Sequence, residues 1–201
     1  PLGFQEQRTL YFANAAQLEM ASVIAFVQLA KQLKGWSAPK TLIERCISAA
    51  QDEVQHAQML SAVAKRHGQK IPALVVSDSA EDMLTVAIHN ACEGCVFETW
   101  SALEAVLKSR RAEPSFRKMY ATIAEDETRH AQLSWELHAW FLQQLSPEQV
   151  TVVEQARSEA LVRLRQQIPL RLSSMPVELG LSTLDRHDEI LARFTAQVLA
   201  S

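Results

Sequence analysis

The sequence predicts an all-α fold of long helices, and three observations support this. The 201 residues include only five glycines and seven prolines, so residues that interrupt helices are rare. Apolar residues recur at helical spacing along almost the whole chain, and no segment shows the alternation expected of a strand. One short motif also occurs twice, as DEVQHAQ at 52–58 and DETRHAQ at 126–132.

The expected helices follow from this periodicity and from the residues that end or begin helices. Five long helices are predicted, over residues 5–34, 39–67, 79–111, 114–145 and 146–167, and a short one is predicted after Ser182. Gly35 and Gly68 are the expected stops of the first two, and Ser77 or Ser79 is the expected cap of the third. Residues 168–181 look irregular.

The repeated motif belongs to a longer internal repeat with an offset of 74 residues (126 − 52 = 74). Glu19 lies 34 residues before Glu53, and Glu93 lies 34 before Glu127. Each half therefore has a glutamate on one helix, a turn, and Glu-x-x-His on the next helix. We expect a single domain over 1–201, with two antiparallel helical hairpins forming a four-helix bundle over 5–145 and a helical C-terminal extension over 146–201.

Carboxylates and imidazoles are predicted at the centre of the apolar face of each bundle helix. The predicted metal ligands are Glu19, Glu53, His56, Glu93, Glu127 and His130. Four buried carboxylates at one level need counter-charge, and two divalent cations would supply it. Mixed oxygen and imidazole donors favour iron or manganese over calcium. The alternative is that the Glu-x-x-His spacing arises by chance on surface helices.

Other polar residues near the motif are candidates for support of the ligands. Asp52 and Asp126 are expected to accept the second N–H of the histidines. His89 and Tyr120 are expected near the ligands, with core packing as the alternative for both. Glu98 competes with Glu93, but it lies roughly 140° around an ideal helix from it, and only a π-helical segment would turn it inward.

Residues 8–145 resemble the ferritin-like superfamily, on the strength of the two Glu-x-x-His motifs and the glutamate that precedes each. The similarity is to the symmetric members, such as bacterioferritins, rubrerythrins and manganese catalases. It implies an antiparallel four-helix bundle holding two iron or manganese ions on the six predicted ligands. The paired Cys-x-x-Cys motifs of full rubrerythrins are absent, so an external electron donor is implied.

The function expected from these observations is that of a dimetal oxidoreductase, with two iron ions that activate dioxygen or peroxide and with room for a small organic substrate. A ferroxidase or other iron-handling protein, or a di-manganese catalase, is the alternative. A net charge of −3 gives no reason to expect nucleic acid or a membrane as a partner. Three cysteines are too few for a disulfide framework, which favours a cytoplasmic protein, expected to be a monomer or dimer.

Overall fold

The computed structural model describes residues 4–66, 68–73, 81–181 and 187–199. All regular structure in those ranges is helical, which confirms the predicted all-α class. The chain forms two compact units, Pro1–Ser79 and Ala80–Ser201. The boundary between them falls inside the predicted bundle of residues 5–145. The four-helix arrangement of that bundle stays a prediction.

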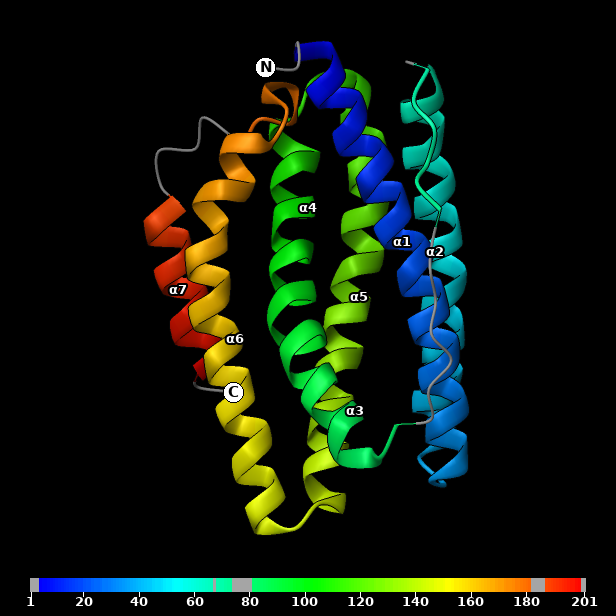
Figure 1. Ribbon diagram of the computed structural model, residues 1–201, viewed down its shortest axis with the longest axis vertical. Coiled ribbons are helices and arrows are strands. Elements are labelled where there is room, and N and C mark those ends of the chain that lie inside the picture. Colours follow the sequence, from blue (N-terminus) through cyan, green and yellow to red (C-terminus); the bar gives the residue numbers. More distant parts are fainter. Residues whose placement is uncertain (1–3, 67, 74–80, 182–186, 200–201) are drawn as a thin grey trace. The chain divides into compact units, whose positions relative to one another are not determined.

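The first unit is a hairpin of two long helices, α1 (Phe4–Gly35) and α2 (Lys40–Arg66), which run in opposite directions (Figure 1). The turn is closed by the Ala38 N–H, which donates to the Leu33 carbonyl over 3.0 Å. Helix α1 ends at Gly35 as predicted, but the left-handed backbone of the turn falls on Ser37, with φ 57°. Gly68 follows α2 with φ 77°, a conformation that glycine adopts at little cost.

Helix α1 is unusually apolar for a helix that is also exposed. Among the described residues, Leu10–Gly35 is the one helical stretch long and apolar enough to cross a membrane by length and composition, with a mean hydropathy of 1.4. A core helix of a soluble protein meets the same test, so this is weak evidence. The expectation of no membrane partner therefore stays a prediction.

The second unit begins with a continuous helical run that changes character in its middle. It comprises α3 (Met83–His89), the π-helix η1 (Asn90–Glu98) and α4 (Thr99–Arg111). Asp82 caps α3, since its side chain accepts from the Thr85 N–H over 2.7 Å. The predicted caps Ser77 and Ser79 lie outside the described residues.

Two further long helices and two short segments complete the second unit. They are α5 (Pro114–Gln144), α6 (Pro147–Ser174), the 3-10 turn η2 (Val177–Leu179) and α7 (His187–Leu199). Helix α4 packs on α5, α6 packs along η1 and α3, and α7 packs on α6 (Figure 1). Ser146, the first residue of the predicted helix 146–167, caps α6 in a capping box with Gln149.

Helix α6 is longer than predicted and continues through Pro169 to Ser174. The predicted end at residue 167 is therefore wrong, as is the irregular structure predicted for 168–174, whereas residues 175–181 hold only the short turn η2. A proline inside a helix removes one backbone hydrogen bond. Ile168 and Leu172, on either side of Pro169, are 1% and 6% exposed, so the buried apolar face of the helix continues past the proline and favours its extension.

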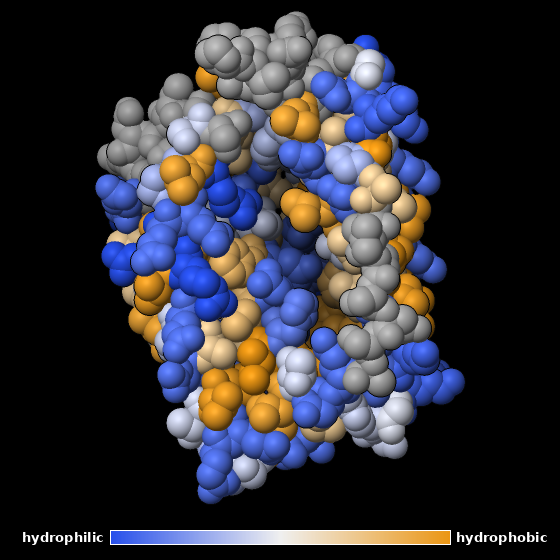
Figure 2. Space-filling view, in the orientation of Figure 1, coloured by the Kyte–Doolittle hydropathy of each residue, from blue (hydrophilic) through white to orange (hydrophobic). Residues whose placement is uncertain are grey.

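The outer face of α6 is mainly hydrophilic, with hydrophobic side chains between the polar ones (Figure 2). Its exposed large hydrophobic residues are Val152, Val162 and Leu170, which are eight to ten positions apart along the helix. Hydrophobic side chains scattered singly in this way are ordinary on protein surfaces and do not indicate a docking site.

Candidate metal centre

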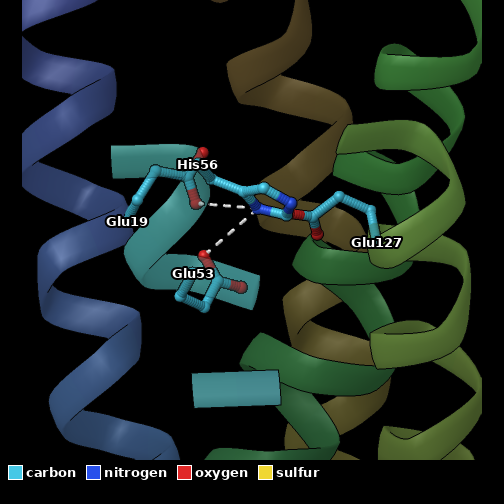
Figure 3. A group of neighbouring side chains, drawn as sticks. All are labelled: Glu19, Glu53, His56 and Glu127. Carbon is cyan, nitrogen blue, oxygen red and sulfur yellow. Dashed lines mark ion pairs between the residues drawn. The ribbon is translucent and has the colours of Figure 1, made fainter. Parts of the chain in front are cut away.

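Three predicted ligands of the first unit come together between α1 and α2 (Figure 3). The Nδ1 atom of His56 lies 3.9 Å from a carboxylate oxygen of Glu19 and 3.6 Å from one of Glu53. Ligand atoms of all three residues lie within 4.8 Å of one another. Glu53 and His56 come from one face of α2, three residues apart, and Glu19 comes from the facing side of α1.

These distances fit a shared metal ion. Oxygen and nitrogen ligands lie about 2.1 Å from a transition-metal ion, so two ligands of one ion are at most about 4.2 Å apart. Both distances from His56 are within that span. Burial adds to the case: His56 is 0% and Glu53 1% exposed, and a buried carboxylate is costly without a positive partner. A protonated His56 is the other partner that this arrangement allows.

Small side chains surround these ligands on α2. Ala49, Ala50 and Ala57 are buried beside Glu53 and His56. Alanine keeps a helix stable while leaving space next to its neighbours. The sequence therefore forms a regular helix here and at the same time leaves the longer donor side chains room to meet.

The motif of the second unit also faces the interior, as predicted. On α5, Glu127 is 7% and His130 2% exposed, three residues apart on one helical face. Ile123, Ala124 and Ala131 are buried along the same face. The second motif thus repeats the burial and spacing of the first.

The glutamate expected to precede this motif is not where the repeat predicted it. Glu93 is exposed instead of core-facing. Glu98 is half-buried, and its carboxylate accepts a hydrogen bond from the Ser134 hydroxyl on α5 over 3.1 Å. The cause is the π-helix over Asn90–Glu98, whose wider turn alters which residues face α5. The π-helical segment that Glu98 would need in order to turn inward is thus present in the structure.

A hydrogen bond within the segment and a close contact with α5 both favour the π-helix. The Gly94 carbonyl accepts the backbone N–H of Thr99, five residues on, and also its hydroxyl over 3.2 Å. A Cβ atom at Gly94 would lie 2.7 Å from the Ser134 hydroxyl oxygen, closer than real Cβ contacts allow. Only glycine lets the two helices approach this closely, and the threonine hydroxyl provides the widened turn with an additional hydrogen bond.

The residues predicted to support the ligands differ in their burial and in their contacts. Asp52 and Asp126 are half-buried on their helices, and Asp126 pairs with Arg129 of the same helix. His89 is exposed, which contradicts the alternative of core packing given for it. The buried face of that helix runs instead through Val86, Ala87, Asn90 and Ala91.

Tyr120 is buried beside a charged cluster. The ring lies 5.4 Å from the Lys108 ammonium, and that ammonium is 3.4 Å from a carboxylate oxygen of Glu104. Glu104 also accepts from the Trp100 indole over 2.8 Å and pairs with Arg171 at 3.3 Å. Burial raises the pKa of Glu104, but these partners outweigh it and hold the pKa below the ordinary 4.5.

The two cysteines of the π-helix, Cys92 and Cys95, are buried and not in disulfides. Burial raises the pKa of the Cys92 and Cys95 thiols. Cys92 lies 3.4 Å from the Ala156 carbonyl and Cys95 3.5 Å from the Ser134 carbonyl, each as a weak donor. Protonated buried thiols are poor nucleophiles, so this Cys-x-x-Cys pair packs the helices together.

Sequence reasoning missed Ser134, Gly94 and the buried Glu104 cluster. The only signal for the first two was a carboxylate, Glu98, that broke the repeat register.

No family model, curated protein or solved structure matches the chain. The assignment of the site therefore rests on the chain's own donors and their geometry.

Proposed function

We propose that the chain is a dimetal oxidoreductase, with two divalent ions, iron by preference, that react with dioxygen or peroxide. In the first unit, Glu19, Glu53 and His56 are the ligands. In the second unit, Glu127 and His130 are ligands, and Glu98 takes the place first assigned to Glu93. That the two sets of ligands share one pair of ions is part of the proposal, and it rests on the 74-residue repeat.

The observation that carries the proposal is the convergence of His56, Glu19 and Glu53, with ligand atoms within 4.8 Å of one another. Two carboxylates and one imidazole form a donor set typical of iron and manganese sites, whereas calcium sites use oxygen donors alone. The second motif has the same residue types, the same spacing and a similar burial. Two independent helices thus offer the same unusual combination of buried carboxylate and imidazole.

The residues of the chain would prepare the site in three ways. Glu53 and Glu127 would provide negative charge in a buried position, which favours binding of a cation over its hydrated state. His56 and His130, each three residues after its glutamate, would add nitrogen donors from the same helical face. Iron held by these residues would supply the electrons that reduce dioxygen or peroxide.

The partners of such an enzyme follow from the same chemistry. The proposed co-substrate is dioxygen or peroxide, and the buried alanines beside the ligands suit a small organic molecule rather than a polymer. Since the cysteines of the π-helix are protonated and packed, we propose that an external donor supplies electrons.

Metal analysis of the purified chain tests this proposal. We expect two iron or manganese ions per chain after anaerobic incubation with Fe(II) or Mn(II) and removal of loosely bound metal. Glu53→Ala and His130→Ala, made separately, should each lose at least one ion. The matched control is Glu44→Ala, because Glu44 lies on the same helix as Glu53 but is exposed and pairs with Lys40 at 3.1 Å.

The metal that binds and the reaction it supports distinguish the candidate functions. Oxidation of only the two bound Fe(II) per chain with uptake of dioxygen would support the oxidoreductase, continued oxidation of added Fe(II) would indicate a ferroxidase, and peroxide breakdown by the manganese form would indicate a catalase. Retention of two ions in both variants would show that the ligands are assigned wrongly. Failure of the wild-type chain to bind either metal would leave His56 as a protonated partner of its two carboxylates and would refute the proposal.

A further inference from the structure

The Ser134 hydroxyl occupies a buried position between the π-helix and the second motif. Ser134 is 2% exposed and lies one helical turn after His130 on α5. Its hydroxyl oxygen is 3.1 Å from a carboxylate oxygen of Glu98 and 3.0 Å from the His130 carbonyl. The carboxylate of Glu98 therefore reaches the turn of α5 that directly follows the motif histidine.

A hydroxyl has one proton and can donate it fully to one acceptor at a time. An ionised carboxylate is the stronger acceptor, because hydrogen bonds to a charged group are worth about twice as much as neutral ones. Ser134 therefore donates to Glu98 while that carboxylate is ionised and in place. When the carboxylate moves away, the His130 carbonyl accepts the proton instead, so the hydroxyl is not left without a partner.

The backbone around Ser134 is fixed by the π-helix. The Asn90 side-chain amide donates to the Ser134 carbonyl over 3.0 Å, and both residues are buried. At Gly94, an added Cβ would lie 2.7 Å from the Ser134 hydroxyl oxygen and 2.8 Å from its Cβ. These contacts set the height of Ser134 relative to Glu98. The hydroxyl is thus fixed in place from both sides.

We propose that Ser134 is a positioning residue that orients the Glu98 carboxylate toward the metal ligands of α5. The inference deepens the proposed function and depends on it, because it assigns the orientation of one ligand to a hydroxyl that does not itself bind metal. Asn90 and Gly94 act through Ser134, by fixing its backbone and by leaving space for its side chain. Groups that hydrogen-bond a metal ligand typically contribute about 10- to 100-fold to metal affinity.

Titration with Co(II), followed by its visible absorption bands, tests the inference without relying on catalysis. Ser134→Ala should weaken binding of one Co(II) by about tenfold or more and shift its bands, since Glu98 is no longer oriented. Alanine has the higher helix propensity, so α5 should fold, which circular dichroism checks. Ser158→Ala is the matched control, because that exposed hydroxyl bonds only the Glu154 carbonyl of its own helix.

A double-mutant cycle distinguishes positioning from a general loss of stability. With Glu98→Ala already in place, adding Ser134→Ala should change the Co(II) affinity little, since Ser134 acts through Glu98. Gly94→Ala tests the same contact in another way, because the added methyl group displaces the Ser134 hydroxyl and should also weaken Co(II) binding. Unchanged affinity and bands in Ser134→Ala, with normal binding by the wild type, would overturn this inference alone. No Co(II) binding by the wild type would overturn both it and the proposed function.

Discussion

The two halves of the chain repeat one sequence plan, but they differ in the helix that precedes the Glu-x-x-His motif. In the first unit, that helix is the regular α1, whereas the corresponding run of the second unit contains the π-helix η1. The residues that build the π-helix have apolar counterparts in the first unit, each 74 positions earlier. The pairs are Asn90 with Ala16, Gly94 with Met20, Glu98 with Ile24, and Ser134 with Leu60.

This substitution pattern explains why one plan gives two local structures. The buried side chain of Leu60 takes the place of Ser134 and offers the facing backbone no hydrogen bond, whereas Met20, the counterpart of Gly94, is 46% exposed on the regular α1. In the second unit, glycine permits a closer approach, and Asn90, Ser134 and Thr99 provide the hydrogen bonds that the widened turn needs.

The comparison also extends to buried charge. Glu104 and His138 are buried in the second unit, and their counterparts 74 positions earlier are Ala30 and Ala64, both buried. The first unit therefore uses alanine where the second has ionisable groups. The second unit should accordingly depend more strongly on its polar interactions, and three predictions test this difference.

The largest expected effect is on Glu104. Glu104→Ala, which introduces the residue that the first unit has, should lower the free energy of unfolding by about 3 kcal/mol, because it removes the carboxylate that pairs with the buried Lys108 ammonium. Urea denaturation measures this. The control is Glu44→Ala, which breaks an exposed Glu–Lys pair of the same spacing and should change the free energy by less than about 1 kcal/mol. Equal effects would show that burial does not distinguish the two pairs.

An intermediate effect is expected at the two rival glutamates of the π-helix. Glu98→Gln should weaken binding of one Mn(II) by at least about tenfold, because it removes a charged ligand. Glu93→Gln should change the affinity by less than about threefold, since an exposed charge contributes little. Isothermal titration calorimetry compares them. A larger loss of Mn(II) affinity in Glu93→Gln than in Glu98→Gln would indicate that Glu93 is the ligand, as the repeat predicts.

The smallest effect concerns the pH dependence of stability at His138. Burial lowers its pKa below the ordinary 6.5, although Glu154, 2.9 Å from the ring, opposes this and Arg157 adds to it. The folded state therefore binds fewer protons than the unfolded state near this pH, and stability rises with pH. The stability that comes with the neutral form of His138 is fully present above about pH 6.5. It is lost as the pH falls through the pKa of His138 in the folded state.

We expect the free energy of unfolding to fall more steeply between pH 7 and 5 in the wild type than in His138→Gln. Chemical denaturation at several pH values gives both slopes, and the difference between them isolates this histidine from the carboxylates that titrate in both proteins. Parallel slopes would mean that His138 keeps its ordinary affinity for protons when folded.

The sequence alone determined most of the secondary structure and one cluster of candidate ligands. Helical periodicity located most helix ends to within a few positions, although α6 continues past its predicted end at residue 167 to Ser174. The convergence of Glu19, Glu53 and His56 followed from their place on apolar helical faces, because regular helices keep a fixed spacing of 3.6 residues per turn. Local rules were sufficient wherever the helix stayed regular.

Tertiary structure decided which glutamate of the second unit faces α5. A regular helix would place Glu93 inward, and the repeat supported that choice. The close approach of Gly94 to Ser134, residues 40 positions apart in the chain, favours a π-helix and brings Glu98 inward instead. Periodicity could not reveal this, because the hydrogen bonds that stabilise the wider turn come in part from a neighbouring helix.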